Sequence, residues 1–509
     1  MSDSLIDILR EISLTNNWFI LLPEITLALI AFLILGIDLF VNNSSRSGRP
    51  LNVREWIISI SLIGQCLVLF LLTFFGNYFF NPNAVLFSGF IEQTENTQFM
   101  RHFLVFSSLG VTFLAAQFFN NKKILKSEYF HILLLATSGF MLLIQSAHFI
   151  AFFVNLELVT IAFYVLIGFQ RTNSLSLEAS LKYLILGGLS SAVMLYGIVL
   201  LYGISGNPEM NSFTQDGFSF SALESFISLN AENTIVRLGA LFVLAGIAFK
   251  IGLVPFQIWV PDVYQGAPFP TTAFLAISSK SAGIFVLFQL IQGPFIALVD
   301  FLMPILSVLC AVTILYGNIA ASGQVVIKRL IGLSGISHAG YLLLGIISSI
   351  FVPEAIYGLL FYLSVYMLSS FLVFGSSIFM DAKGDSCIEI KDFQGLIKNN
   401  PILGVAGLVG LGSLAGVPPL GGFIAKTLIL IAAFKADLYS LIVVSLIGIV
   451  ISIYYYFGWI RSILFIQKGE SLIFNSLSSL SLGQRFFLWF LILSVVLIGI
   501  FPKLLTQFI

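Results

Sequence analysis

Long, uninterrupted runs of apolar residues recur from one end of this 509-residue chain to the other. Each run is about 20 residues long, the length that a helix needs to cross the hydrocarbon core of a bilayer. Apolar and polar positions do not alternate within the runs, as they do in the strands of a membrane barrel. The pattern therefore predicts an all-α polytopic membrane protein. Fourteen spans are expected, at 17–41, 56–76, 99–119, 129–147, 148–170, 180–204, 234–259, 271–292, 295–317, 326–350, 354–380, 401–434, 438–464 and 485–507.

Two of these spans, 234–259 and 401–434, contain both glycine and proline next to a lysine. The first includes AFKIGLVPFQIW at 248–259, and the second includes GSLAGVPPLGGFIAK at 412–426. We interpret both as broken helices, which a membrane tolerates only where protein or water satisfies the freed backbone groups. Broken helices at matching places in two halves of a chain point to the site of a transporter.

The spacing of the two broken spans predicts an internal repeat. They are the seventh and the twelfth spans, and an odd offset of five places the second unit upside down relative to the first. We therefore expect two inverted five-helix repeats, flanked by further spans at both ends. Helices one to three occupy 1–128, the first repeat 129–292, the second repeat 293–464 and helix fourteen 465–509.

Lysine and arginine are distributed unevenly between the predicted loops. If both termini lie on one side, that side carries five of the 24 basic residues and the opposite side carries sixteen. By the positive-inside rule the richer side faces the cytoplasm or the mitochondrial matrix, so both termini face away from it. The three remaining basic residues, Lys250, Lys280 and Lys426, fall inside spans. Outside the spans, residues 221–229 predict a short amphipathic helix on the surface.

The composition narrows the class of protein further. Hydrophobic residues make up 58% of the chain and charged residues 9%, and the mean hydropathy is +1.02, whereas about a quarter of a soluble domain is charged. Basic and acidic residues both number 24, so no net charge would attract a nucleic acid. Three scattered cysteines are too few for an iron–sulfur cluster, a structural zinc site or a disulfide framework. We expect neither a metal nor a cofactor in this chain.

Lys250 lies deep inside its span, just before the break. A lysine at the centre of a membrane helix costs roughly 2.5–3.5 kcal/mol, so it needs a partner or a function. Either its ammonium snorkels to the interface, or it lies in a hydrated cavity where it gains and loses a proton. Glu157, in the middle of span 148–170, is the obvious counter-ion. The sequence leaves open whether this pair is static or switchable.

Three further polar residues lie inside spans. Lys280 has small neighbours at 278–283, which leave room for water or let the lysine bind backbone carbonyls. His338 is either a packed core residue or a relay, since its ordinary pKa lies nearest neutrality. Tyr341 and Ser334 could extend a hydrogen-bonded path from it. Lys426 follows the second break, on the opposite flank from Lys250 in the first.

Three acidic residues lie near the ends of spans. Glu24 begins the first span and is expected at the interface or in the first turn of the helix. Asp38 and Asp300 are expected to be solvated.

Several of these segments carry a resemblance to a known family. The chain resembles the antiporter-like, proton-translocating membrane subunits of respiratory complex I, of the subunit-2 type (subunit N of the bacterial NADH-quinone oxidoreductase, NADH dehydrogenase subunit 2). One departure is Gln257, where the family often has histidine. The matching segments are LEL at 156–158, LKYLILGG at 181–188, FKIGLVPFQIW at 249–259, PDVYQGAP at 261–268, KRL at 328–330, GISHAGY at 335–341 and GVPPLGGF at 416–423.

The resemblance implies a role in proton transfer for five residues. Glu157 and Lys250 would be the coupled acid–lysine pair, and Lys280 the central relay lysine. His338 would be the relay histidine, and Lys426 the lysine toward the exit or the next subunit. Proton transfer would be coupled to quinone reduction in other subunits of the enzyme, which makes this chain part of a translocase.

The resemblance also implies the surroundings of the chain. NADH, FMN, iron–sulfur clusters and quinone would be held by partner subunits. The partners would be other membrane-arm subunits, including neighbouring antiporter-like ones, together with lipids and protons but no nucleic acid. The location would be an energy-transducing membrane, either the mitochondrial inner membrane or the bacterial plasma membrane, with both termini on the intermembrane-space or periplasmic side. The alternatives are a subunit of a cation/proton antiporter complex and a purely structural membrane scaffold.

Overall fold

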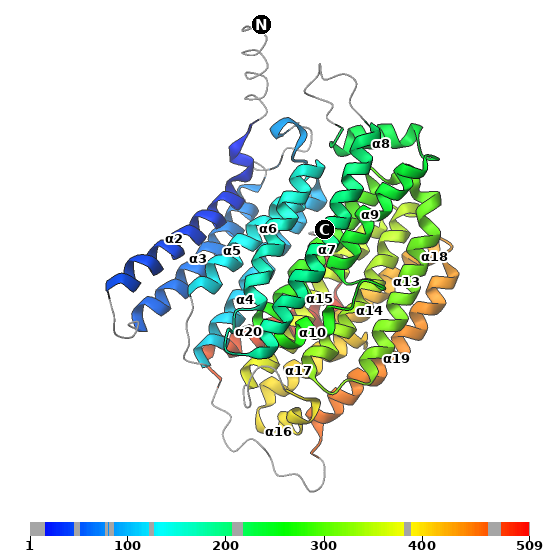
Figure 1. The fold of residues 1–509 in the computed structure, drawn as a ribbon. Coiled ribbons are helices and arrows are strands. Elements are labelled where there is room, and N and C mark those ends of the chain that lie inside the picture. Colours follow the sequence, from blue (N-terminus) through cyan, green and yellow to red (C-terminus); the bar gives the residue numbers. More distant parts are fainter. Residues whose placement is uncertain are drawn as a thin grey trace.

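A computed structural model describes residues 16–44, 51–76, 80, 86–121, 127–205, 217–380, 388–466 and 480–507. Within these residues the protein is a bundle of long helices without a β-sheet (Figure 1). Twelve helical segments are long and apolar enough to cross a membrane. They are α2 (Leu22–Ser44), α3 (Leu51–Phe74), α4 (Glu95–Asn121), α6 (Phe149–Ile167), α7 (Ser174–Ser205), α9 (Thr234–Ile251), the continuous run of α11 (Phe269–Phe274), η4 (Leu275–Ser279) and α12 (Lys280–Gln292), α13 (Val299–Ser322), α14 (Ile327–Phe351), α15 (Ala355–Met380), α19 (Tyr439–Leu464) and α20 (Leu482–Ile500).

Shorter helices supply the other two predicted spans. One is α5 (Ser127–Leu143), with 17 residues. The other is the pair α17 (Pro401–Ala415) and α18 (Gly421–Lys435), with 15 residues each. The all-α polytopic fold is thus confirmed, while the division of the chain into four parts stays a prediction. The surface helix expected at 221–229 is also present as α8 (Phe220–Leu229).

Both predicted breaks exist, and a glycine ends the helix in each. α9 stops at Gly252, whose φ is 81°, and α17 stops at Gly416, whose φ is 88°. These left-handed conformations suit glycine because it lacks a Cβ atom. At the first break, the N–H groups of Gly252 and of the next residue both donate to the carbonyl of Ala248. At the second break, the N–H groups of Gly416 and of the next residue both donate to the carbonyl of Gly412. The two breaks are therefore built by the same local structure.

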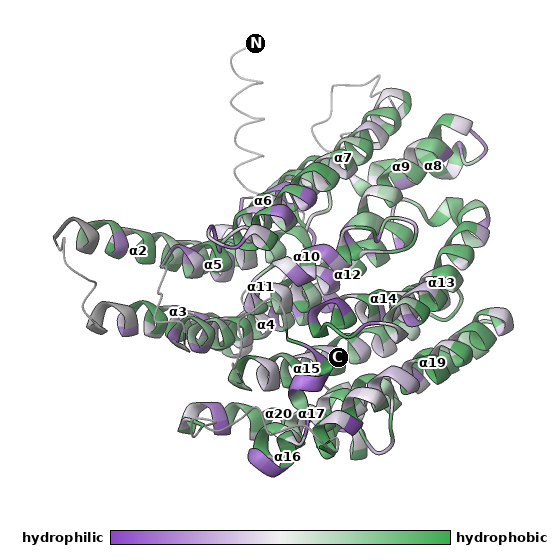
Figure 2. Ribbon diagram, turned by 60° about the horizontal axis from the view of Figure 1, so that its bottom comes forward, coloured by the Kyte–Doolittle hydropathy of each residue, from purple (hydrophilic) through white to green (hydrophobic). Residues whose placement is uncertain are grey.

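The helices differ in how much of their apolar surface is buried. All of the apolar segment of α14 and 94% of that of α15 are buried, against 28% of that of α20. A helix that is apolar all round and buried all round belongs in the core of a bundle. Outer helices such as α2, α3 and α19 present apolar residues along most of their length (Figure 2). α14 and α15 therefore place their polar side chains far from the surface.

Glu24 agrees with one of its two sequence-based expectations, a place in the first turn of the helix, and not with exposure at the interface. It is in the first turn of α2, but it is only 1% exposed. Its two carboxylate oxygens accept hydrogen bonds of 2.8 Å each from Arg101 of α4, which is fully buried. Gln145 donates a further bond of 2.8 Å. The sequence did not indicate this burial, because the partners of Glu24 lie 77 and 121 positions away in the chain.

Asp38 is a second correction. It is 8% exposed rather than solvated. α2 packs along α5, and this contact covers Asp38 and brings it within electrostatic range of His131. Asp300 is exposed, as expected.

Replacing Arg101 by alanine should strongly destabilise the protein. The substitution leaves the Glu24 carboxylate buried without its counter-charge, which costs about 3–5 kcal/mol. Lys435→Ala is the matched control, because its pair with Glu354 is long, at 4.0 Å, and exposed, and such pairs contribute about 1 kcal/mol or less. The measurement is the thermal unfolding midpoint of the purified assembly. Equal midpoints for the two variants would contradict this account of the Glu24–Arg101 pair.

Candidate functional site

Lys250 is anchored inside the helix bundle. It lies in the last turn of α9, two residues before the glycine that ends the helix. Its Nζ atom donates a hydrogen bond of 2.8 Å to Thr160 Oγ1 of α6, and Thr160 is buried. The ammonium therefore points into the protein rather than toward the membrane interface.

Glu157 and Lys250 do not form the direct ion pair that the sequence suggested. No oxygen of Glu157 lies within 4.0 Å of the Lys250 ammonium, and Glu157 Oε1 instead accepts a hydrogen bond of 2.5 Å from Ser191 of α7. Thr160 follows Glu157 by three residues on α6, so the two side chains share one face. The carboxylate still attracts the Lys250 charge through space. Glu157 is thus bound by the Ser191 hydroxyl and Lys250 by the Thr160 hydroxyl, so the acid and the lysine are neighbours without a direct contact.

A small cavity extends from Lys250 toward the next lysine. Its volume is about 30 Å³, and its polar lining consists of Lys250, Thr160, Tyr183 and Ser279. Ser279 ends the π-helical turn η4 and directly precedes Lys280. Single π-helical turns occur frequently at functional sites. Because Ser279 lines the cavity beside Lys250 and directly precedes Lys280, this turn joins the cavity to the second lysine.

Lys280 is 4% exposed and binds a backbone carbonyl. Its Nζ atom donates a hydrogen bond of 2.6 Å to the oxygen of Gly335 in α14 and lies 5.7 Å from the centre of the Tyr366 ring. A Cβ atom on Gly335 would lie only 2.6 Å from Nζ. Only glycine at this position leaves room for the ammonium.

His338 follows Gly335 by one helical turn and is bonded at both ring nitrogens. Nδ1 lies 2.7 Å from the hydroxyl of Tyr362 in α15, and Nε2 lies 3.2 Å from the hydroxyl of Tyr456 in α19. A neutral imidazole donates at one nitrogen and accepts at the other. The ring can therefore receive a proton on one side and release one on the other.

Lys426 lies in α18, the second half of the second broken helix, and its side chain reaches back to the end of the first half. Its Nζ atom donates a hydrogen bond of 2.9 Å to the carbonyl oxygen of Ala415, the last residue of α17. A cation is stabilised there by the free carbonyl groups and the helix dipole. A cavity of about 10 Å³ lies between Lys426 and His338.

The sequence-based reasoning missed the tyrosines around His338. Tyr362 and Tyr366 come from α15, and Tyr455 and Tyr456 come from α19. Tyr455 donates a hydrogen bond of 3.2 Å to Asn318 Oδ1 in α13, which extends the polar cluster. Tyrosines four residues apart inside an otherwise apolar span were the signal that could have revealed them.

Of the two residues expected to extend the path from His338, Ser334 also bonds the Tyr456 hydroxyl that contacts the histidine. The Tyr341 hydroxyl donates to the carbonyl of Ser445, and the Ser334 hydroxyl donates to the carbonyl of Ile331. Tyr341 instead lies beneath Lys426, whose Nζ atom is 5.4 Å from the ring centre. Gln257 occupies the position where the family often has histidine. It is buried, and its amide oxygen has no hydrogen-bond partner among the described residues.

Residues 146–452, which include all five candidate residues, match the family model described as NADH:quinone oxidoreductase/Mrp antiporter, TM. The chain is also 47% identical over 454 residues to NADH-quinone oxidoreductase subunit N 1 of Opitutus terrae, an alignment that covers 88% of each protein. The chain belongs to this subunit N family. In the described residues no group of three or more His, Cys, Asp or Glu side chains could hold a metal ion.

Solved structures agree with this membership. A chain of respiratory complex I from Thermus thermophilus with bound aureothin is 26% identical, with a TM-score of 0.75 and coverage of 96% of this chain and 99% of that one. A chain of the Mrp complex from Dietzia sp. is 19% identical, with a TM-score of 0.77 and coverage of 95% and 96%. The second likeness shows a shared fold alone.

Ordered water should occupy the cavity between Lys250 and Ser279. Its volume of about 30 Å³ exceeds the roughly 10–15 Å³ that one water requires, and polar partners are present. The measurement is a high-resolution density map of the assembled protein. A groove formed by Leu186, Val193 and Phe256 serves as the internal comparison, because it is larger, at about 200 Å³, but almost wholly apolar. A dry cavity at Lys250 would show that the two lysines are not linked by water.

Proposed function

We propose that this chain is a proton-translocating membrane-arm subunit of NADH:quinone oxidoreductase. It would act as part of that translocase, coupling quinone reduction in other subunits to proton transfer through this one. The observation that carries the proposal is the succession of protonatable side chains through the core. Each member from Lys250 to Lys426 is linked to the next by a cavity, a shared helix turn or an aromatic contact.

The proposed path begins at Glu157 and Lys250. When the two side chains approach each other, the carboxylate stabilises the proton on the lysine. When Ser191 and Thr160 hold them apart, as in this structure, that stabilisation weakens and the proton can leave through the water-sized cavity. Separation and approach of this pair would be the switch that receives a signal from the neighbouring subunit.

Beyond the cavity the proposed path follows α14. Lys280 binds the Gly335 carbonyl one turn from His338, and the Tyr366 ring contacts both the lysine and the histidine. Lys426 lies across the second cavity from His338. Each charge moved across the membrane works against roughly 2.3 kcal/mol per 100 mV, which the redox reaction elsewhere must supply.

The proposal assigns the redox chemistry to partner subunits. NADH, FMN, the iron–sulfur clusters and quinone would bind there, and other antiporter-like subunits would lie beside this chain in the membrane arm. The membrane would be energy-transducing, with the termini on its intermembrane-space or periplasmic face. The uneven distribution of basic residues supports that orientation.

A subunit of a cation/proton antiporter complex is the second candidate, favoured by the shared fold with the Mrp complex. Exchange of Na⁺ or K⁺ for H⁺ by the purified chain alone in vesicles would support it. A structural scaffold is disfavoured, because three lysines inside spans are costly without a function.

Lys250→Ala should abolish proton pumping coupled to quinone reduction, because the path loses its first protonatable base. The measurement is the proton-to-electron stoichiometry of the assembled complex in vesicles. Lys503→Ala, which removes an exposed lysine near the C-terminus, is the control and should leave the stoichiometry unchanged. An unchanged stoichiometry in Lys250→Ala would exclude the proposed path.

Gly335→Ala should slow proton transfer while leaving assembly intact. The new Cβ atom displaces the Lys280 ammonium, which is the flexible end of a side chain, so packing is little disturbed. Loss of a charge-assisted hydrogen bond predicts a pumping rate about tenfold lower. Gly345→Ala on the same helix is the control, since its Cβ would make ordinary contacts of 3.4 Å. Equal pumping by both variants would refute the role of the Gly335 carbonyl.

A further inference from the structure

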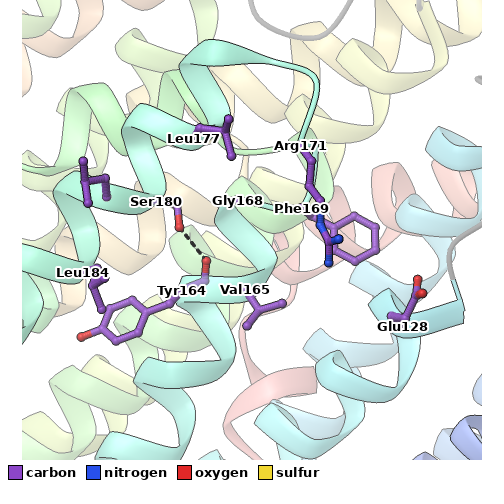
Figure 3. A pocket seen from close by; sticks show the side chains of 10 residues that line it. Glu128, Tyr164, Val165, Gly168, Phe169, Arg171, Leu177, Ser180 and Leu184 are labelled. Atoms are coloured by element: carbon purple, nitrogen blue, oxygen red, sulfur yellow. Dashed lines mark hydrogen bonds between the residues drawn. The ribbon is translucent and has the colours of Figure 1, made fainter.

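An open pocket lies on the outer surface where two membrane spans end, away from the lysine path. Its volume is about 680 Å³, and it is formed by the start of α5, the end of α6 and the start of α7 (Figure 3). It is far larger than the cavities along the path, and its size falls within the range of small-ligand sites. Because both α6 and α7 are membrane spans, their shared end lies at the level of the lipid headgroups.

Two opposite charges line the pocket without neutralising each other. Arg171 lies on the connection between α6 and α7, and Glu128 lies at the start of α5 (Figure 3). Both side chains are exposed, and no ion pair of 4.0 Å or less joins either to a described residue. Among its described lining residues, the pocket therefore offers one cationic and one anionic side chain to a ligand.

Most of the remaining lining residues are apolar, and three leucines of α7 face outward. Leu177, Leu181 and Leu184 of α7 are 48%, 56% and 46% exposed, and they lie three or four residues apart, so they form one stripe along the helix. Ser180 adds no free polar group, because its hydroxyl donates a hydrogen bond of 2.8 Å to the Tyr164 carbonyl (Figure 3). A small soluble zwitterion would leave this stripe uncovered, whereas an acyl chain would cover it.

We propose that the pocket binds phosphatidylethanolamine. The lipid phosphate contacts Arg171, the ammonium donates hydrogen bonds to Glu128, and one acyl chain lies along Leu177, Leu181 and Leu184. A choline headgroup has no N–H donor for Glu128, and an anionic headgroup without an amine meets an uncompensated carboxylate. Charge-assisted hydrogen bonds to both ends of the headgroup therefore select the ethanolamine lipid. This inference needs only that the chain is embedded in a membrane.

Photolabelling of the whole assembly tests the proposal. The assembly is placed in phosphatidylglycerol vesicles that contain a trace of phosphatidylethanolamine with a photoreactive acyl chain, or of phosphatidylcholine with the same chain. Labelled peptides covering 164–184 are quantified by mass spectrometry. We expect the ethanolamine probe to label them about tenfold more than the choline probe, as one charge-assisted hydrogen bond predicts.

Substitutions distinguish this site from general contact with lipid. Glu128→Gln should reduce ethanolamine labelling to the choline level, because the ammonium loses its acceptor. Arg171→Gln should reduce labelling by both probes, because both headgroups carry the phosphate that Arg171 contacts. Both residues are exposed, so the variants should assemble. Arg485→Gln, which removes an exposed arginine outside the pocket, should leave labelling unchanged. Equal labelling by the two probes, labelling unaffected by either pocket substitution, or cross-links from this pocket to a neighbouring subunit would each overturn the proposal. None of these readouts depends on proton pumping.

Discussion

A buried ammonium group needs hydrogen-bond acceptors in place of water. The positions of the lysines in the helix bundle follow from this requirement. No lysine of the candidate site is neutralised by a carboxylate within 4.0 Å in the described residues. Lys250 binds a threonine hydroxyl, Lys280 a mid-helix carbonyl and Lys426 the carbonyl that ends a broken helix. Neutral acceptors support the charged form less strongly than a carboxylate does. These lysines are therefore held in place by acceptors that carry no net charge.

The broken helices follow from the same requirement. A continuous helix uses its carbonyl groups internally, so it has few to offer to a side chain. Ending α17 at Gly416 frees the carbonyl of Ala415, which Lys426 then uses. Ending α9 at Gly252 places Lys250 in a last turn instead of in mid-helix. The glycines fix where the chain turns, and at the second break Lys426 uses the carbonyl that the turn exposes.

The sequence revealed the location of charged residues better than the identity of their partners. Lys250, Lys280 and Lys426 stood out because no loop could contain them, and the breaks were visible as glycine and proline inside apolar spans. Contacts between helices were not visible in this way. Glu24 and Arg101 are 77 positions apart, and nothing in the local pattern around either residue indicates the other. The tyrosines of α15 and α19 were missed for the same reason, since an apolar pattern identifies a buried helix but not its neighbours.

The two hydrogen bonds of His338 limit how many protons it can carry at once. With Tyr362 on one nitrogen and Tyr456 on the other, a proton that arrives on one side leaves from the other, and the ring changes tautomer. Both hydroxyl groups then point the opposite way along the chain of bonds. A second proton cannot follow in the same direction until the ring and the hydroxyls have turned back. In the proposed path, His338 would therefore pass one proton at a time between the two tyrosine hydroxyl groups.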